Sequence, residues 1–76
     1  MLYTLIIQQT PIEALSNLKH RGFPPVGLYD CGGETMVLVD IDASTLARWI
    51  EEPNTQLKAY YGGDLLNAET PSLSHD

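Results

Sequence analysis

Cys31, the one cysteine of the chain, lies in the stretch GLYDCGGETMVLVD (27–40), after Asp30 and before Gly32 and Gly33. A thiol becomes a nucleophile when a nearby cation stabilises the thiolate, whereas a neighbouring carboxylate disfavours it. No Lys or Arg stands close to Cys31 in the sequence, and Asp30 adjoins it. We therefore interpret the stretch as a hairpin bend and predict no catalytic role for Cys31.

Other candidates for chemistry also have structural explanations. His20 would serve as a base only if the fold brought it to Cys31, and the end of an expected helix already favours a cation there. Asp40 and Asp42 stand at a strand-to-helix junction, where carboxylates can bind a cation, but Asp42 also suits helix capping. One cysteine and two distant histidines give no zinc-ligand spacing. We predict no enzyme, no metal and no cofactor.

The elements that position these residues follow from periodicity and from start and stop signals. Thr10, Pro11 and Glu13 form a capping box with proline at the first helical position, and Gly22 suits the end of that helix. Pro24 and Pro25 indicate an edge strand, and two glycines favour a tight turn. The predicted elements are a strand over 2–9, a helix from about 11 to 21, strands at 26–31 and 34–41, a helix at 43–52 and a strand at 55–61.

This β-α-β-β-α-β order resembles the ferredoxin-like, or split βαβ, architecture, an α+β fold with an antiparallel sheet and two helices on one face. The resemblance covers residues 1–61 as a single domain, near the lower size limit for a single hydrophobic core. It concerns layout alone and implies no function, because this architecture hosts many activities. We expect residues 62–76 to form a flexible, polar and acidic tail.

Strand alternation divides the apolar residues between two faces of the expected sheet. In the last strand, it places Leu57, Ala59 and Tyr61 on one side and Tyr60 on the other. The expected core consists of Tyr3, Leu5, Ile7, Leu15, Leu18, Val37, Val39, Leu46, Ile50 and Leu57. The expected apolar residues of the opposite face, which no helix covers, are Leu2, Ile6, Met36 and Leu38.

Charge and hydropathy argue against several classes of protein. Four Lys or Arg against ten Asp or Glu give a net charge of −6, which disfavours direct binding to nucleic-acid phosphates. The basic cluster Lys19 to Arg21 suits the C-terminal end of a helix. The longest apolar run, Leu5 to Ile7, is too short to span a membrane, and the N-terminus lacks the features of a secretion signal. We expect a soluble, cytoplasmic protein without membrane contact.

Absent motifs separate the chain from several families of this layout. The strand ETMVLVDI lacks the aromatics on which RNA-recognition modules stack bases. The segment QQTPIE stands where heavy-metal transport domains carry a CxxC pair, and where acylphosphatase-like enzymes need a glycine-rich phosphate loop with an arginine. Amino-acid-sensing regulatory domains share the layout, but they usually work as paired modules attached to an enzyme.

Two hypotheses of different classes remain. The favoured one is a small acidic, non-catalytic protein that docks on a larger macromolecule, another protein, and inhibits or modulates it. By analogy, a phage or mobile-element inhibitor occupying the nucleic-acid-binding surface of its target is one such protein. The alternative is a small-ligand regulatory domain or a small dimeric enzyme, and the uncovered sheet face would also serve a homodimer. The residues predicted to bind the partner are Leu2, Ile6, Met36, Leu38, Trp49, Glu51, Glu52, Tyr60 and Tyr61.

Overall fold

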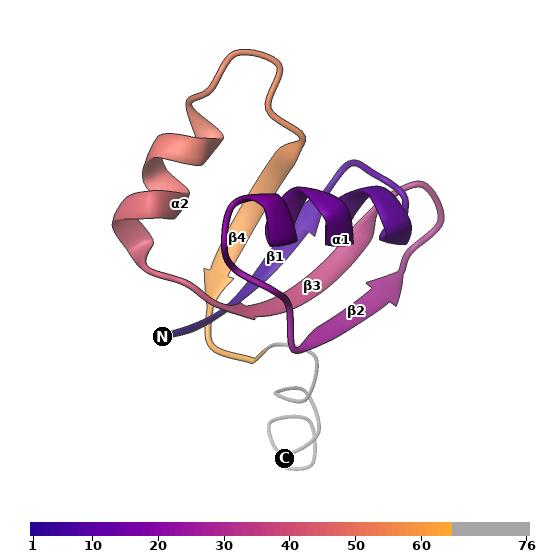
Figure 1. Cartoon of the computed structure of the whole chain (residues 1–76), viewed down its shortest axis with the longest axis horizontal. Coiled ribbons are helices and arrows are strands. Elements are labelled where there is room, and N and C mark those ends of the chain that lie inside the picture. The colour runs from indigo at the N-terminus through magenta and orange to yellow at the C-terminus, as the bar shows by residue number, and fades with distance from the viewer. Residues whose placement is uncertain (65–76) are drawn as a thin grey trace, which may run out of the picture.

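The computed structural model describes residues 1–64. Figure 1 shows a curved sheet with the first helix in front of it and the second helix beside its last strand. All strand pairs are antiparallel, in the order β2-β3-β1-β4, so the protein has the ferredoxin-like α+β fold that the sequence predicts. The tail expected at 62–76 lies, from residue 65 on, outside the described residues. The elements are β1 (Leu2–Ile7), α1 (Pro11–His20), β2 (Gly27–Asp30), β3 (Thr35–Asp40), α2 (Ala43–Ile50) and β4 (Leu57–Gly62).

The helix ends form as the sequence predicts. Thr10 and Glu13 make the reciprocal capping box at the start of α1. Beyond its C-terminal end, Gly22 has a φ of +91°, in the left-handed region that favours glycine. Asp42 caps α2, where its carboxylate accepts a 3.0 Å hydrogen bond from the backbone N–H of Thr45. Helix α2 ends at Ile50, two residues earlier than predicted.

An irregularity in β4 overturns the predicted alternation of that strand. Ile7 pairs with Leu57, but Ile6, the residue before it in β1, pairs with Ala59. Lys58 is therefore an extra residue of β4 in the ladder. An inserted residue moves every later side chain to the other face of the sheet. Leu57 consequently points into the core, whereas Ala59 points away from it.

The core lies between the sheet and the two helices, and its composition differs from the prediction at α2. Leu46 is buried there as expected, but its buried neighbour is Trp49, which is 1% exposed. Ala43 and Ala47 stand three residues before and one residue after Leu46, a spacing that permits them to share its side of the helix, but both are exposed. Helix α2 therefore turns the side that carries Leu46 and Trp49 toward the core. The bulk of the indole explains this orientation, because burying Trp49 removes more apolar surface from water than burying two alanines. The buried apolar residues are Leu5, Ile7, Ala14, Leu18, Val37, Val39, Ile41, Leu46, Trp49 and Leu57; Tyr3, Leu15 and Ile50 are half-buried.

A polar cluster joins the C-terminal ends of the two helices above Trp49. The Arg21 guanidinium lies 4.1 Å from the centre of the indole, within the range of a cation–π contact. Its two terminal nitrogens donate to the Glu52 carboxylate at 2.9 and 3.2 Å, and its Nε donates to Asn17 Oδ1 at 2.8 Å. Arg21 is therefore committed to holding α1 against α2, and we call this cluster the helix clamp.

Trp49→Ala should lower the free energy of unfolding by about 3–5 kcal/mol, the usual cost of removing a buried aromatic side chain. Ile12→Ala provides the matched control, because Ile12 is an apolar helical residue that is 81% exposed. Its effect should stay within about 0.5 kcal/mol. Urea unfolding followed by circular dichroism measures both variants, and equal effects would contradict the placement of Trp49.

Candidate interaction surface

The side of the sheet that faces away from α1 and α2 carries a compact group of apolar side chains. We call this surface the open face. In β1 and β3 the even-numbered residues lie on it, because the odd-numbered ones are buried or half-buried under the helices. Strand register aligns two rows across all four strands: Tyr29, Met36, Ile6 and Ala59 in one, and Gly27, Leu38, Thr4 and Tyr61 in the other.

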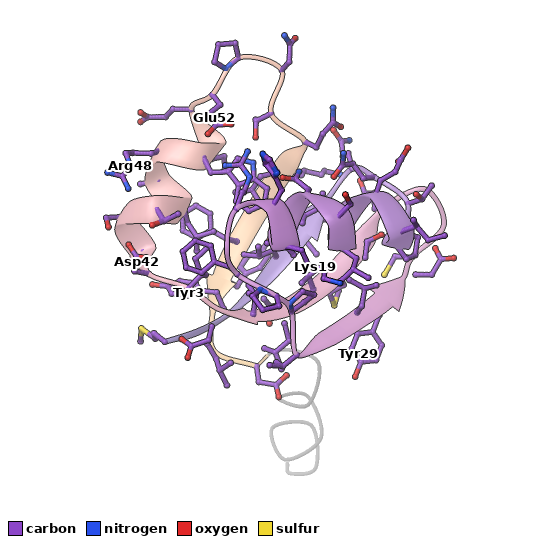
Figure 2. All side chains as sticks on the ribbon, in the orientation of Figure 1. Tyr3, Lys19, Tyr29, Asp42, Arg48 and Glu52 are labelled. Atoms are coloured by element: carbon purple, nitrogen blue, oxygen red, sulfur yellow. The ribbon has the colours of Figure 1, made fainter. Side chains whose placement is uncertain are left out.

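The tyrosines of the outer strands are more exposed than the aliphatic residues of the two central strands. Met36, Leu38 and Ile6 are half-buried, whereas Tyr29 on β2 is 50% exposed and Tyr61 on β4 is 49% exposed. Figure 2 shows Tyr29 projecting from the β2 edge. The open face therefore has an aliphatic centre with a half-exposed tyrosine on each side.

Thr4 gives the centre of the open face a polar group whose hydrogen bond is made within the protein. Its side chain is buried, and its Oγ1 donates to the carbonyl oxygen of Gly63 at 2.9 Å. The backbone N–H of Gly63 donates to the Leu2 carbonyl, so the chain stays bonded to the sheet beyond the last residue of β4.

Ion pairs lie at both ends of the open face. At one end, Lys58 Nζ lies 2.8 Å from the Glu34 carboxylate. This hydrogen bond lowers the pKa of Glu34 and raises that of Lys58. At the other end, the N-terminal ammonium of Met1 pairs with Asp40. Each pair contains one positive and one negative group, so the border of the open face is close to neutral although the chain carries a net charge of −6.

Both edges of the sheet have features that oppose pairing with a further strand. Strand β2 has four residues and follows Pro24 and Pro25, which lack a backbone N–H. Strand β4 has its irregularity at Lys58, whose side chain is 54% exposed. Short strands, prolines, bulges and edge lysines are the usual ways of preventing edge-to-edge association. The open face is therefore better suited to binding than either edge.

The structure brings five of the nine predicted partner-binding residues together on this surface: Leu2, Ile6, Met36, Leu38 and Tyr61. The expectation that Trp49 is accessible to a partner is wrong, because Trp49 is buried beneath Arg21. Tyr60 faces the core side and makes an edge-to-face contact with Tyr3 at 6.1 Å. Glu52 belongs to the helix clamp, and Glu51 is exposed at the end of α2.

Sequence reasoning did not identify Tyr29, Gly27 and Ala59 as parts of the same surface. For β2 the necessary signal was present. A turn at the two glycines pairs Asp30 with Thr35, and counting back from this pair places Tyr29 beside Met36. For Ala59 no such signal existed, because its face depends on the extra residue in β4.

The stretch around Cys31 forms a hairpin bend, as the sequence predicts. The backbone N–H of Cys31 donates to the Glu34 carbonyl at 2.8 Å, and Gly32 and Gly33 have φ angles of 68° and 93°. Cys31 is exposed, and its thiol lies 3.7 Å from the Tyr29 carbonyl oxygen. Residues 1–64 hold no group of three or more His, Cys, Asp or Glu side chains arranged for a metal ion.

His20 and Cys31 lie near opposite ends of α1. Thr35, whose backbone pairs with Asp30 beside Cys31, donates its hydroxyl to the Gln9 carbonyl just before α1 begins. His20 is the last residue of the helix, which at 1.5 Å per residue is roughly 14 Å further on. The two side chains therefore do not form a nucleophile–base pair.

Asp42, the other candidate for cation binding, is fully engaged as a helix cap. Its carboxylate accepts hydrogen bonds from the hydroxyls of Ser44 and Thr45 and from the backbone N–H of Thr45. These bonds, led by the one from Ser44, lower the pKa of Asp42 from 3.8 to about 2. The nearby Asp40 is paired with the N-terminal ammonium instead.

Comparison of the chain with protein-family models, with curated proteins and with solved structures found no match. Within residues 1–64, neither α1 nor α2 is long and apolar enough to cross a lipid bilayer.

The capping role of Asp42 predicts a specific dependence of stability on pH. A carboxylate whose pKa is lower in the folded state contributes stability above its unfolded pKa and loses it as the pH falls through the folded value. This contribution should be complete above about pH 4 and should disappear toward pH 2. In Asp42→Asn, which keeps a capping oxygen but does not titrate, melting temperatures should fall less over this interval. Identical pH profiles would contradict the assignment.

Cys31→Ser should change the free energy of unfolding by less than about 0.5 kcal/mol, because the side chain is exposed and the bend depends on backbone bonds and glycines. Gly33→Val is the informative contrast, since a β-branched residue is strained at positive φ. Urea unfolding should find it less stable than Cys31→Ser, and the reverse order would count against this account of the bend.

Proposed function

We propose that the protein is a small, non-catalytic binding module that docks its open face on an apolar surface of a larger protein and thereby modulates it. The observation that carries the proposal is the open face itself, with its half-buried aliphatic centre and two half-exposed tyrosines. Contiguous apolar surface on a small domain usually marks an interaction site.

The composition of the open face supports a protein partner. Protein interfaces typically have an apolar centre enriched in aromatic residues and methionine, surrounded by a polar rim. Ile6, Met36 and Leu38 supply the aliphatic centre, and the ion pairs at the two ends supply charged groups for the rim. Tyr29 and Tyr61 add large contact area at little cost in conformational entropy, as tyrosines do at many binding surfaces.

The distribution of charge favours docking by apolar contact over electrostatic capture. Although ten carboxylates outnumber four basic side chains, most of the described carboxylates have partners within the fold. The ones engaged in caps, turns or ion pairs are Glu13, Asp30, Glu34, Asp40, Asp42 and Glu52. We therefore expect partner binding to depend on buried apolar area and to depend only weakly on ionic strength.

The test compares the wild type with the double variant Ile6→Lys, Leu38→Glu in chemical cross-linking and capture from cells that express the protein. Charges in the centre of the open face should abolish capture of the partner. The introduced Lys and Glu lie diagonally on adjacent strands, where opposite charges attract, so the fold should survive. Ile12→Lys is the matched control, because it places a charge on exposed helix surface.

Two further measurements accompany the capture experiment. Circular dichroism establishes that the variants are folded, and capture is repeated at high salt. The proposal predicts that the wild type and Ile12→Lys retain the same partner at both salt concentrations. If the folded double variant retains that partner, or if capture by the wild type is lost at high salt, the open face is not the docking surface.

A further inference from the structure

We infer that the open face is self-complementary and that a second copy of this chain packs on it, about a twofold axis parallel to the strands. This inference does not depend on the foreign partner proposed above, because it concerns the purified chain alone. It is carried by the positions of large and small residues on the open face.

The two rows of the open face have large and small residues at alternate corners. Tyr29 and Ala59 lie at the β2 and β4 ends of one row, whereas Gly27 and Tyr61 lie at the same ends of the other. The tyrosines thus occupy one diagonal of the surface, and the two small residues occupy the other. Each tyrosine is about half exposed, whereas alanine has a small side chain and glycine has none, so a large residue of a second copy would find more room over these two corners.

A twofold axis parallel to the strands brings unlike corners together. It places β2 of one copy over β4 of the other without exchanging the rows. Tyr29 then lies over Ala59 of the second copy, and Tyr61 lies over Gly27. In the centre, Met36 lies over Ile6 of the second copy. Such a contact is isologous, since each pairing occurs twice, and it resembles a sandwich in which two sheets pack about 10 Å apart with nearly aligned strands.

The charges at the ends of the open face select this axis over the other in-plane twofold. An axis perpendicular to the strands would also place tyrosines over small residues, but it would exchange the two ends of the sheet. Glu34 would then lie over Asp40 of the second copy, which places like charges together. The β1–β3 register, continued one residue past Ile7 and Thr35, sets Gln8 opposite Glu34. The parallel axis therefore places Glu34 over the neutral Gln8 of the second copy, so this axis satisfies both shape and charge.

The size of the open face limits the strength of the contact. Four strands spaced about 4.8 Å apart, three of them six residues long and β2 four, span at most roughly 19 by 20 Å at about 3.3 Å per residue. This planar area is about half of the roughly 800 Å² that each partner buries in a standard interface. The dimer should therefore be weak and dependent on concentration. A weak dimer covers the apolar surface at high concentration and leaves it available to another protein at low concentration.

The test measures self-association of the full chain by sedimentation equilibrium over a wide range of concentration. The wild type should dimerise reversibly. Ala59→Trp adds apolar area but fills the place of the Tyr29 ring of the second copy, so it should weaken the dimer at least about tenfold. Nonspecific apolar association would instead be strengthened by the added indole. Ala47→Trp is the matched control, since Ala47 is exposed on α2, away from the open face.

A double variant tests the axis. Tyr29→Ala combined with Ala59→Tyr exchanges the large and small residues of one row. About the parallel axis they still face each other, so dimerisation should recover relative to Ala59→Trp. About the perpendicular axis the new tyrosine would meet Tyr61 of the second copy, and dimerisation would stay weak.

An isotope-filtered NOE experiment on a mixture of labelled and unlabelled wild-type chains keeps the inference testable if this double variant does not fold. Within one copy, Tyr29 and Ala59 lie three strand spacings apart, roughly 14 Å, so an NOE between them must arise between copies. A wild type that stays monomeric at every concentration, or a dimer without this NOE, overturns the inference, whatever else covers the open face.

Discussion

The two short helices of residues 1–64 cover only one face of the sheet, and the other properties of this part of the chain depend on that constraint. Side chains of a strand point alternately to the two faces, so the apolar residues of β1 and β3 are divided between a covered and an uncovered side. Helices α1 and α2, with ten and eight residues, bury the odd-numbered side chains of both strands. Ile6, Met36 and Leu38 are left on the uncovered side. Alternation alone does not require apolar residues at these three positions, since polar residues there would still pair as strands.

The helix clamp shows how such a small layer of helices is held in place. Trp49 fills the space that α2 has to cover. Arg21 closes that space from the solvent side and joins Asn17 on α1 to Glu52, two residues beyond the end of α2. The same arrangement accounts for charges that would otherwise suggest a binding site. Arg21 belongs to the one basic cluster of the sequence, and Glu52 to a pair of glutamates that the helix dipole does not favour. Their mutual hydrogen bonds explain both, and the open face is left as the surface whose composition the fold itself does not explain.

Local signals in the sequence predict the fold well, and tertiary packing decides what they miss. The capping box at Thr10, the glycine turn after Cys31 and the alternation in β1 and β3 are encoded by neighbouring residues, and each forms as expected. The orientation of α2 is not encoded locally, because Ala43 and Ala47 suit either a buried or an exposed position and only the demands of the core select Trp49. The side of Ala59 depends on one extra residue in β4, which no pattern within that strand indicates. Most of the candidate surface was therefore predictable from β1 and β3, whereas its outer corners required the register of the whole sheet.

The contrast between the edges and the open face supports the face-to-face association proposed above. Pro25 before the short β2, and Lys58 at the irregularity in β4, discourage the addition of a strand at either side. Among residues 1–64, the centre of the open face carries no charged side chain, and its polar residue, Thr4, is buried and bonded to Gly63. The charged groups that border the open face in this part of the chain lie at its ends, where they are paired with opposite charges. A surface with blocked edges and an apolar centre restricts association to one geometry, the packing of face against face. Because such packing joins two finite surfaces and leaves no free strand to continue the contact, it produces closed complexes rather than extended aggregates.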